Sequence, residues 1–466
     1  MDIKEKRQYE KLALTPINKL ITVMAIPTTI SMMISMIYNL VDAYFVGRLG
    51  TSASASIGIL LSVQPIFQAL GFLLGHGSGT NISMRLGKGD REAADRFAST
   101  AFFTGLIISI IPAVLGLLFI EPLMKVLGST PTILPYAKAY GTYILISGPA
   151  LTLSCILNNI MRYEGKAVYA MVGLVSGGVL NMIGDPIFMF GFGMGINGAG
   201  LSTALSQYIS LAILGYMFLS GKTISRITPT RISRDRMVLY HIFKNGLPSL
   251  IRQLLNSLSS MTLNICANPY GDAAIAAMAI TGRIAMFIGS AMMGIGQGFQ
   301  PVSSYNYSNQ KYRRLRDAFS FTLKAGETVL GILALLCFIF PAQVITIFRD
   351  DPEVIEIGVV ALRCQCIAII LTPISILSNM LFQSIGQSRL ASFAATLRSG
   401  LYYIPLLLIL PKLIGITGLE ITSMIATILT TLTCLPLVIL FFRKMPREDM
   451  ATELDRKYQA SLKQAD

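Results

Sequence analysis

Charged residues are scarce in this chain of 466 residues. Only 13% are Asp, Glu, Lys or Arg, whereas 53% are hydrophobic and the mean hydropathy is +0.62. A soluble globular protein carries about 25% charged residues, so too few are present to cover three water-facing domains. Apolar runs of about 20 residues recur along the chain, the length that crosses a bilayer core of roughly 30 Å. The composition therefore predicts an all-α polytopic membrane protein and argues against an outer-membrane barrel, whose short strands alternate.

Residues that usually carry catalysis or bind metals are also rare. The chain has two histidines, no tryptophan, and six cysteines that all fall inside apolar runs. No nucleophile–base or metal-ligand spacing is present, and the phosphate-binding pattern Gly-x-x-x-x-Gly-Lys-[Ser/Thr] does not occur. These absences argue against an integral-membrane enzyme, a disulfide framework and a nucleotide-driven pump. We expect no tightly bound cofactor, and the energy for any transport must come from an ion gradient.

The apolar runs define twelve membrane spans, and the basic residues orient them. Of 38 Lys and Arg residues, 28 lie on the N-terminal tail, the even-numbered loops and the C-terminal tail, and five lie on the opposite loops. This asymmetry predicts a multi-pass protein of the cell (inner or plasma) membrane with both termini in the cytoplasm. It accounts for the net charge of +14 without a nucleic-acid partner. The predicted spans are 17–46, 53–80, 95–120, 134–160, 168–192, 196–220, 239–267, 273–300, 318–341, 355–383, 391–411 and 416–442.

The two halves of the sequence repeat each other. The same offset in residue number relates Pro27 to Pro248 and Gly165 to Gly386, and it aligns several other turns. We call this offset the repeat shift. Each half holds six spans, so the halves share one orientation, the parallel-repeat plan of several secondary transporters. We therefore predict an N-lobe (1–220), a cytoplasmic inter-lobe linker (221–238), a C-lobe (239–445) and a cytoplasmic tail (446–466).

Proline within a span removes a backbone hydrogen bond and kinks the helix. Pro27 lies in the first span, and a kink there suits a transporter whose helix must change shape, so Pro27 is a candidate hinge. Many of the 40 glycines have a simpler explanation, since small residues let helices pack closely in lipid.

Acidic residues inside spans mark a candidate cation site. Asp42 lies in the first span and Asp185 in the fifth, each about one to two turns from the outer end. A charge at such a position costs at least about 2.5–3.5 kcal/mol, so it usually faces a cavity or a partner. Asn181 lies four residues before Asp185 and shares its helical face, and Thr203 lies at similar depth in the sixth span. We predict that these four side chains converge in one pocket of the N-terminal half.

The pocket permits two coupling ions. Carboxylate, carboxamide and hydroxyl oxygens suit a hard cation, which makes Na⁺ at Asp42, Asn181, Asp185 and Thr203 a possible metal site. A pair of nearby carboxylates equally holds a proton near neutral pH. The alternative is that the two aspartates only cap helix ends or pair with Arg48.

The embedded charges of the C-terminal half are mostly basic. Lys324 and Glu327 are three residues apart and can pair along one helix face, while the others have no evident partner. This difference predicts that ion handling belongs to the first lobe. The other embedded basic residues are Arg252, Arg283, Arg363 and Arg398.

The substrate side is less specific. The chain contains 23 methionines, 23 phenylalanines and 18 tyrosines, and methionine-rich walls repack around different ligands while aromatic faces attract organic cations. For any single methionine, packing against helices or lipid is the commoner role. The candidate cavity residues are Tyr38, Phe45, Met286, Met292 and Met293.

Three motifs of the sequence are specific in combination. They are Tyr38–Gly50 (YNLVDAYFVGRLG), Arg85–Asp95 (RLGKGDREAAD) and Asn181–Gly200 (NMIGDPIFMFGFGMGINGAG). Together they resemble the MATE (multidrug and toxic compound extrusion) family, and specifically its MepA-like branch. The likeness covers essentially the whole chain, including twelve spans in duplicated halves. It implies that Asp42, Asn181 and Asp185 form the N-lobe cation site, with Thr203 as a further ligand. It also implies that bending at Pro27 accompanies the change of this site.

The resemblance implies a secondary active antiporter that exports amphipathic, mostly cationic organic compounds in exchange for inward Na⁺ or H⁺. The expected partners are small organic cations and the lipid bilayer, with no nucleotide or nucleic acid, and the two-lobed cavity needs only a monomer. The alternative is a flippase or exporter of a lipid-linked or endogenous anionic metabolite, which the basic residues of the C-terminal half would favour.

Overall fold

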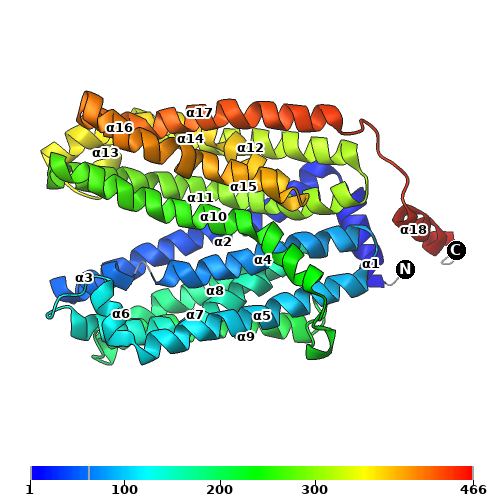
Figure 1. The fold of residues 1–466 in the computed structure, drawn as a ribbon, viewed down its shortest axis with the longest axis horizontal. Coiled ribbons are helices and arrows are strands. Elements are labelled where there is room, and N and C mark those ends of the chain that lie inside the picture. The colour runs from blue at the N-terminus through cyan, green and yellow to red at the C-terminus, as the bar shows by residue number, and fades with distance from the viewer. Residues whose placement is uncertain (1–2, 61–62, 464–466) are drawn as a thin grey trace. The chain divides into compact units, whose positions relative to one another are not determined.

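The chain folds into long helices joined by short turns in a computed structural model that describes residues 3–60 and 63–463 (Figure 1). No strand occurs within these residues, which confirms the predicted all-α class. The helices are α1 (Ile3–Tyr9), α2 (Ile17–Gly47), α3 (Thr51–Leu60), α4 (Gln64–Gly87), α5 (Arg91–Leu118), α6 (Ile120–Val126), α7 (Leu134–Tyr163), α8 (Ala167–Pro186), α9 (Ile196–Leu219), α10 (Arg236–Ala267), α11 (Asp272–Ser308), α12 (Tyr312–Ile339), α13 (Pro341–Thr346), α14 (Pro352–Ser384), α15 (Ser388–Thr396), α16 (Ile404–Ile414), α17 (Ile416–Lys444) and α18 (Glu453–Lys463).

Eleven stretches of the described chain are long and apolar enough to cross a membrane. They match eleven of the twelve predicted spans. The remaining span corresponds to α10, which is 32 residues long but carries polar residues such as Arg252 and Asn256. Two spans contain π-helical turns, η2 (Ile187–Gly191) after α8 and η5 (Leu397–Tyr403) between α15 and α16.

The helices form two compact units, and two helices are divided between them. The first unit comprises the described residues of 1–11, 30–250 and 457–466, and the second comprises 12–29 and 251–456. The division therefore falls inside α2, after Thr29, and inside α10, after Leu250, two positions that the repeat shift carries onto each other. The predicted lobes follow sequence order, whereas the units follow packing, and the two schemes differ most in these half-helices.

Each half-helix packs closely within its unit. In the second unit, Thr28 Oγ1 donates a hydrogen bond to the carbonyl of Gly294 in α11 at 2.6 Å. In the first unit, Gly246 of α10 lies against the Leu73 carbonyl of α4, so close that any Cβ at this position would overlap it. Ser249 Oγ, at the position that corresponds to Thr28, lies 2.6 Å from His76 Nδ1.

The internal repeat is visible in the local geometry of each half. Asn158 Nδ2 donates to the Ala170 carbonyl at 2.8 Å, and Asn379 Nδ2 donates to the Ala391 carbonyl at 2.7 Å. The repeat shift relates the two donors to each other and the two acceptors to each other. Left-handed backbone also recurs at this spacing: Gly165 and Gly386 have φ of 81° and 77°. Gln310, with φ 55°, stands where the first half has Gly89. Turns of similar geometry therefore follow corresponding helices in the two halves.

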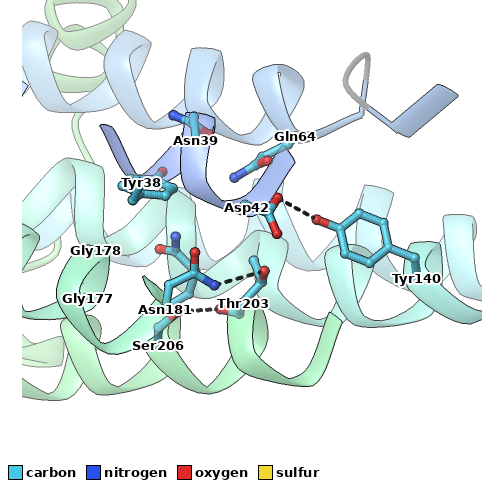
Figure 2. A pocket seen from close by; sticks show the side chains of 11 residues that line it. Tyr38, Asn39, Asp42, Gln64, Tyr140, Gly177, Gly178, Asn181, Thr203 and Ser206 are labelled. Carbon is cyan, nitrogen blue, oxygen red and sulfur yellow. Dashed lines mark hydrogen bonds between the residues drawn. The ribbon is translucent and has the colours of Figure 1, made fainter. Parts of the chain in front are cut away.

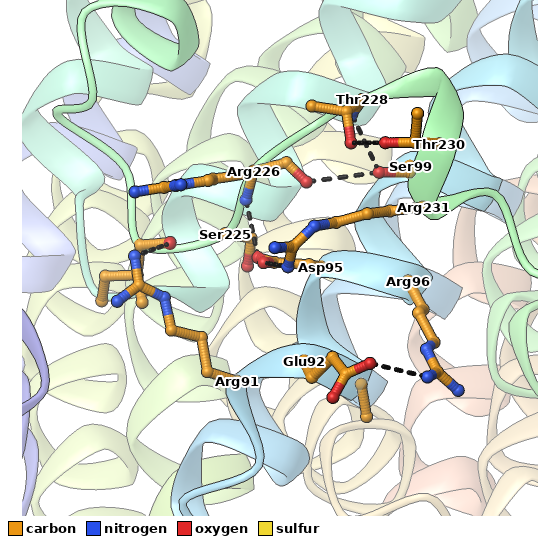
Figure 3. Close-up of polar contacts among 12 residues, drawn as sticks. Arg91, Glu92, Asp95, Arg96, Ser99, Ser225, Arg226, Thr228, Thr230 and Arg231 are labelled. Atoms are coloured by element: carbon orange, nitrogen blue, oxygen red, sulfur yellow. Dashed lines mark hydrogen bonds and ion pairs between the residues drawn. The ribbon is translucent and has the colours of Figure 1, made fainter.

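The linker 221–238 is bonded to the first unit along much of its length (Figure 3). Asp95 of α5 accepts a hydrogen bond from the Arg226 main-chain N–H at 2.7 Å and forms an ion pair with Arg231. Ser99, one turn later, accepts from the main-chain N–H of Thr228 at 3.1 Å. A long flexible tether would leave these groups in water, so the segment acts as a fixed strap on α5.

A second anchor holds the start of the same strap. Glu164, in the turn after α7, is buried and accepts the main-chain N–H groups of Ile224 and Ser225 at 2.7 and 2.8 Å. Burial raises the pKa of the Glu164 carboxyl, and these donors oppose the rise by binding its ionised form.

Candidate functional site

A small polar cavity lies within the first unit, between five helices (Figure 2). Its volume is about 20 Å³, enough for one water molecule or one small ion. The side chains come from α2, α4, α7, α8 and α9. They are Tyr38, Asn39, Asp42, Gln64, Tyr140, Gly177, Gly178, Asn181, Thr203, Ser206 and Gln207.

Asn181 is the centre of the polar contacts between α8 and α9. Its Nδ2 lies 3.2 Å from Asp185 Oδ1, one turn along α8, and 3.3 Å from Thr203 Oγ1 on α9. Ser202 Oγ donates to the Asn181 main-chain carbonyl at 3.2 Å. All four side chains are buried. The i,i+4 spacing of Asn181 and Asp185 thus places an amide donor beside a carboxylate, as the sequence predicts.

Asp42 reaches the same cavity from α2. Its Oδ2 lies 3.5 Å from the Tyr140 hydroxyl of α7, and its carboxyl group is close enough to that of Asp185 for the two to interact electrostatically. Figure 2 shows Asp42 between Gln64 and Tyr140, facing the Asn181–Thr203 pair. Two carboxyl groups therefore share one buried region, where like charges repel strongly.

One oxygen of each aspartate has no hydrogen-bond donor. Asp42 Oδ1 and Asp185 Oδ2 are both buried, and no N–H or O–H group of the described residues donates to either. A buried carboxylate oxygen without a donor is costly, and a bound cation or a shared proton would remove the cost. These oxygens, together with those of Asn181 and Thr203, fit a hard cation.

The structure brings together all four residues of the predicted cation site. Tyr38, predicted for the substrate cavity, instead lines this small cavity. Phe45 packs against Phe190 with ring centroids 6.3 Å apart. Pro27 lies elsewhere, inside the half of α2 that belongs to the second unit.

The three predicted cavity methionines of α11 lie in different surroundings. Met292 is fully buried, with its sulfur against Gly326 of α12. Met286 is 60% exposed, and Met293 is half-buried. Met292 therefore packs between helices, and none of the three methionines lines the 20 Å³ cavity.

Sequence reasoning found Asn181 and Thr203 but missed the other neutral residues at the site. Tyr140, Gln64 and Ser202 all contribute polar atoms at or beside the cavity, yet hydroxyl and amide residues are common in spans. The one available signal was the spacing of Ser202, Thr203 and Ser206, which places polar groups on one side of α9.

A family model and known proteins match this chain over most of its length. The model described as MatE matches residues 27–187 and 248–409, two segments that begin at Pro27 and Pro248, the pair that defines the repeat shift. "Multidrug export protein MepA" of Staphylococcus saprophyticus is 28% identical over 417 residues, covering 89% of this chain and 92% of that protein.

Solved structures agree with the fold. A MATE structure in complex with MaL6 has a TM-score of 0.90 and 25% identity, covering 94% of this chain and 99% of the other. A MOP-superfamily transporter from Pyrococcus furiosus has a TM-score of 0.89 and 25% identity, covering 94% and 98%; its title reports a binding pocket of reversed polarity that suggests a different function. The chain therefore has the fold of both, with its spans in duplicated halves.

Proposed function

The chain belongs to the MatE family of membrane transporters, and we propose that it exports structurally varied organic compounds from the cell in exchange for inward Na⁺ or H⁺. It is a transporter rather than an enzyme. The relative named as a multidrug export protein supports the substrate range. The observation that carries the coupling is the pair of aspartates in the first unit, each with a buried oxygen that accepts no hydrogen bond from the described residues.

In the proposed mechanism the aspartate pair senses whether a cation is bound. With both carboxylates ionised, their repulsion favours an arrangement of α2 and α8 that admits a cation or a proton. Binding neutralises part of this charge, and Asn181 keeps Asp185 oriented through its 3.2 Å hydrogen bond. Pro27 lies in the same helix as Asp42, so α2 can change its bend when the charge at Asp42 changes.

The exported compound binds elsewhere. A volume of about 20 Å³ admits no organic molecule, whereas drug-sized ligands occupy roughly 300–1,000 Å³. We propose amphipathic organic cations as the main substrates, because aromatic side chains, whose faces attract such ions, and adaptable methionine side chains are both abundant. The protein would then work as a monomer in the cell membrane, with both termini in the cytoplasm, and with no tightly bound cofactor.

Ethidium efflux from proteoliposomes tests this function. A Na⁺ gradient and a pH gradient are imposed separately on vesicles that contain the folded protein, and empty vesicles serve as the control. Efflux driven by one gradient supports the proposal and identifies the coupling ion. Protein that is folded and remains silent under both gradients contradicts it.

A second function is favoured by the basic residues of the second unit. Arg283 and Arg363 are exposed on their helices, and Arg252 donates to Asn379 Oδ1 at 3.0 Å. These cations would suit an anionic metabolite or a lipid-linked substrate. The matched Pyrococcus furiosus transporter, which is described as having a binding pocket of reversed polarity and a different function, supports this alternative. Transport of an anionic dye in the same vesicles, without ethidium efflux, would support this alternative.

A further inference from the structure

A groove of about 420 Å³ opens in the second unit between the ends of α12, α14 and α17. These are the helix ends that the distribution of basic residues assigns to the cytoplasm. Three of the ten lining residues are arginines, the other seven are apolar, and none is acidic. The groove lies outside the first unit, so it takes no part in the cation site.

The three arginines gather at one end of the groove. Arg316 of α12 donates to the main-chain carbonyls of Phe442 and Met445 at 2.7 and 2.8 Å, which fixes its guanidinium beside the end of α17. Arg443 and Arg447 are exposed, and neither forms an ion pair with any described residue. The nearby acid Asp449 instead accepts the main-chain N–H of Arg313 at 2.8 Å. This end of the groove therefore holds three cationic side chains, none of which forms an ion pair with a described acid.

The apolar part of the groove continues along the same two helices. Leu323 follows Arg316 by seven residues, and Leu435 precedes Arg443 by eight, which places both leucines roughly 10–12 Å deeper along the helix axes. Leu435 and Ile439 are 43% and 42% exposed, so the groove wall is open to the side. The arrangement is thus a cationic end at headgroup level above an apolar channel at the level of acyl chains.

We propose that this groove binds an anionic phospholipid of the cytoplasmic leaflet. The phosphate would lie among Arg316, Arg443 and Arg447, and one acyl chain would lie along Leu435 and Ile439. A basic pocket between membrane helices on the cytoplasmic side is the arrangement that recognises anionic headgroups. A free inorganic anion would not use the apolar channel, and a zwitterionic lipid would bring a cation to a site that already holds three.

Lipid binding to the purified full-length protein tests the proposal without any transport assay. Phosphatidylglycerol and phosphatidylcholine with the same acyl chains are titrated separately, and bound lipid is counted by native mass spectrometry. We expect tighter binding of phosphatidylglycerol and its loss in the double variant Arg443→Gln/Arg447→Gln. Each arginine near the membrane surface contributes about 1 kcal/mol, so the affinity should fall roughly 30-fold. Arg316 is left intact because it also holds the end of α17.

Arg234→Gln/Arg236→Gln is the matched control. It removes the same charge from two exposed linker residues and should leave the affinity for phosphatidylglycerol unchanged. Equal binding of the two lipids by the native protein, or an equal loss in both double variants, would overturn the proposal.

A second variant tests the apolar channel at constant charge. Ile439→Trp fills the open wall and should weaken phosphatidylglycerol binding by several-fold while the protein stays folded, as judged by its elution volume. Glycerol 3-phosphate, which has the headgroup but no acyl chain, should compete poorly. If it competes as well as the lipid, or if Ile439→Trp binds normally, the site recognises a free anion and the lipid proposal is wrong.

Discussion

The two halves of this protein share a scaffold but not a polar site. Under the repeat shift, both aspartates of the proposed cation site correspond to leucines, which cannot hold a hard cation. Leu263, which replaces the first aspartate, packs against an apolar cluster that contains Leu407. The corresponding pairs are Asp42 and Leu263, Asn181 and Tyr402, and Asp185 and Leu406, whereas the glycines that open α9 and α17, Gly195 and Gly415, are one residue closer than the shift and pair Thr203 with Ser423.

The shared features are structural. The asparagine-to-carbonyl hydrogen bonds, the left-handed turns and the division of α2 and α10 between units all recur at the same spacing. A duplicated fold therefore needs these contacts in both copies, whereas the proposed cation site occurs in one copy only among the described residues. The lesson is that repeated positions report on folding, and positions that break the repeat report on function.

The largest expected effect comes from the positions that break the repeat. Asp42→Asn and Asp185→Asn each remove a charge that the buried site uses to attract a cation, so we expect ethidium efflux to fall to the level of empty vesicles. Glu420→Gln is the matched control, because Glu420 is a buried acid of the second unit, 6% exposed. This variant should retain ethidium efflux. Expression and elution volume check that each variant folds.

The opposite pattern would refute the assignment. Normal gradient-driven efflux in Asp42→Asn, or an equal loss in Glu420→Gln, would mean that the coupling site does not lie in the first half alone.

The repeated hydrogen bonds should matter about equally in the two halves. Asn158→Ala and Asn379→Ala each leave a buried carbonyl, of Ala170 or Ala391, without its side-chain donor. The expected cost is about 1–3 kcal/mol each, seen as a lower Tm in detergent. The cost should be somewhat larger at Asn379, because Arg252 also loses its acceptor there. A large effect in one half and none in the other would show that the repeat is only geometric.

A smaller effect is expected where the left-handed turns differ. Gly165→Ala and Gly386→Ala place a Cβ at φ of 81° and 77°, which costs about 1–2 kcal/mol. Gln310→Gly should instead raise Tm, because it restores the residue type that Gly89 supplies in the first half. A fall in Tm for Gln310→Gly would mean that its side chain contributes more than its backbone strain costs.

The smallest effect concerns an exposed acid that only the first half carries. Glu121 lies between Lys138 and Lys125, both 2.9 Å away, and these hydrogen bonds lower its pKa to about 2. A lowered pKa in the folded state stabilises the protein above the usual pKa of a glutamate, and this contribution is lost as the pH falls towards 2. Between pH 5 and pH 3 the Tm of the Glu121→Gln variant should therefore fall less than the Tm of the native protein. The control variant Glu356→Gln, in the second half, should show the same dependence of Tm on pH as the native protein.

The spans were predictable because their ends carry clear chemical signals. The predicted 134–160 and 416–442 differ by only a few residues from Leu134–Tyr163 and Ile416–Lys444, since charges or glycines flank each apolar run. The predicted 273–300 is eight residues short at its end, because α11 continues to Ser308. The turns beyond residue 300 contain Ser303, Ser304 and Asn306, which are buried in protein. From hydropathy alone, a polar helical turn of this kind cannot be told from a loop.

The charged residues of the site were predictable, and its neutral residues were predictable only in part. Asp42 and Asp185 stand out because a carboxylate inside a span is expensive unless it has a use. Tyr140 and Gln64 carry no such cost, and only the packing of α4 and α7 beside α2 brings them to the cavity. Pairing of α2 with its neighbours is a long-range contact, which a single sequence does not encode in any local pattern.

The strap on α5 has a consequence for how this sequence can change. Five of its anchoring bonds come from main-chain N–H groups, which donate to carboxyl and hydroxyl oxygens of Asp95, Ser99, Thr100 and Glu164. Main-chain donors are the same for every residue except proline, so most side chains of the strap are free to vary. The receiving residues have no such freedom. Most positions of the segment should therefore tolerate any residue except proline. The four acceptor residues, which are distant in sequence, should tolerate few substitutions.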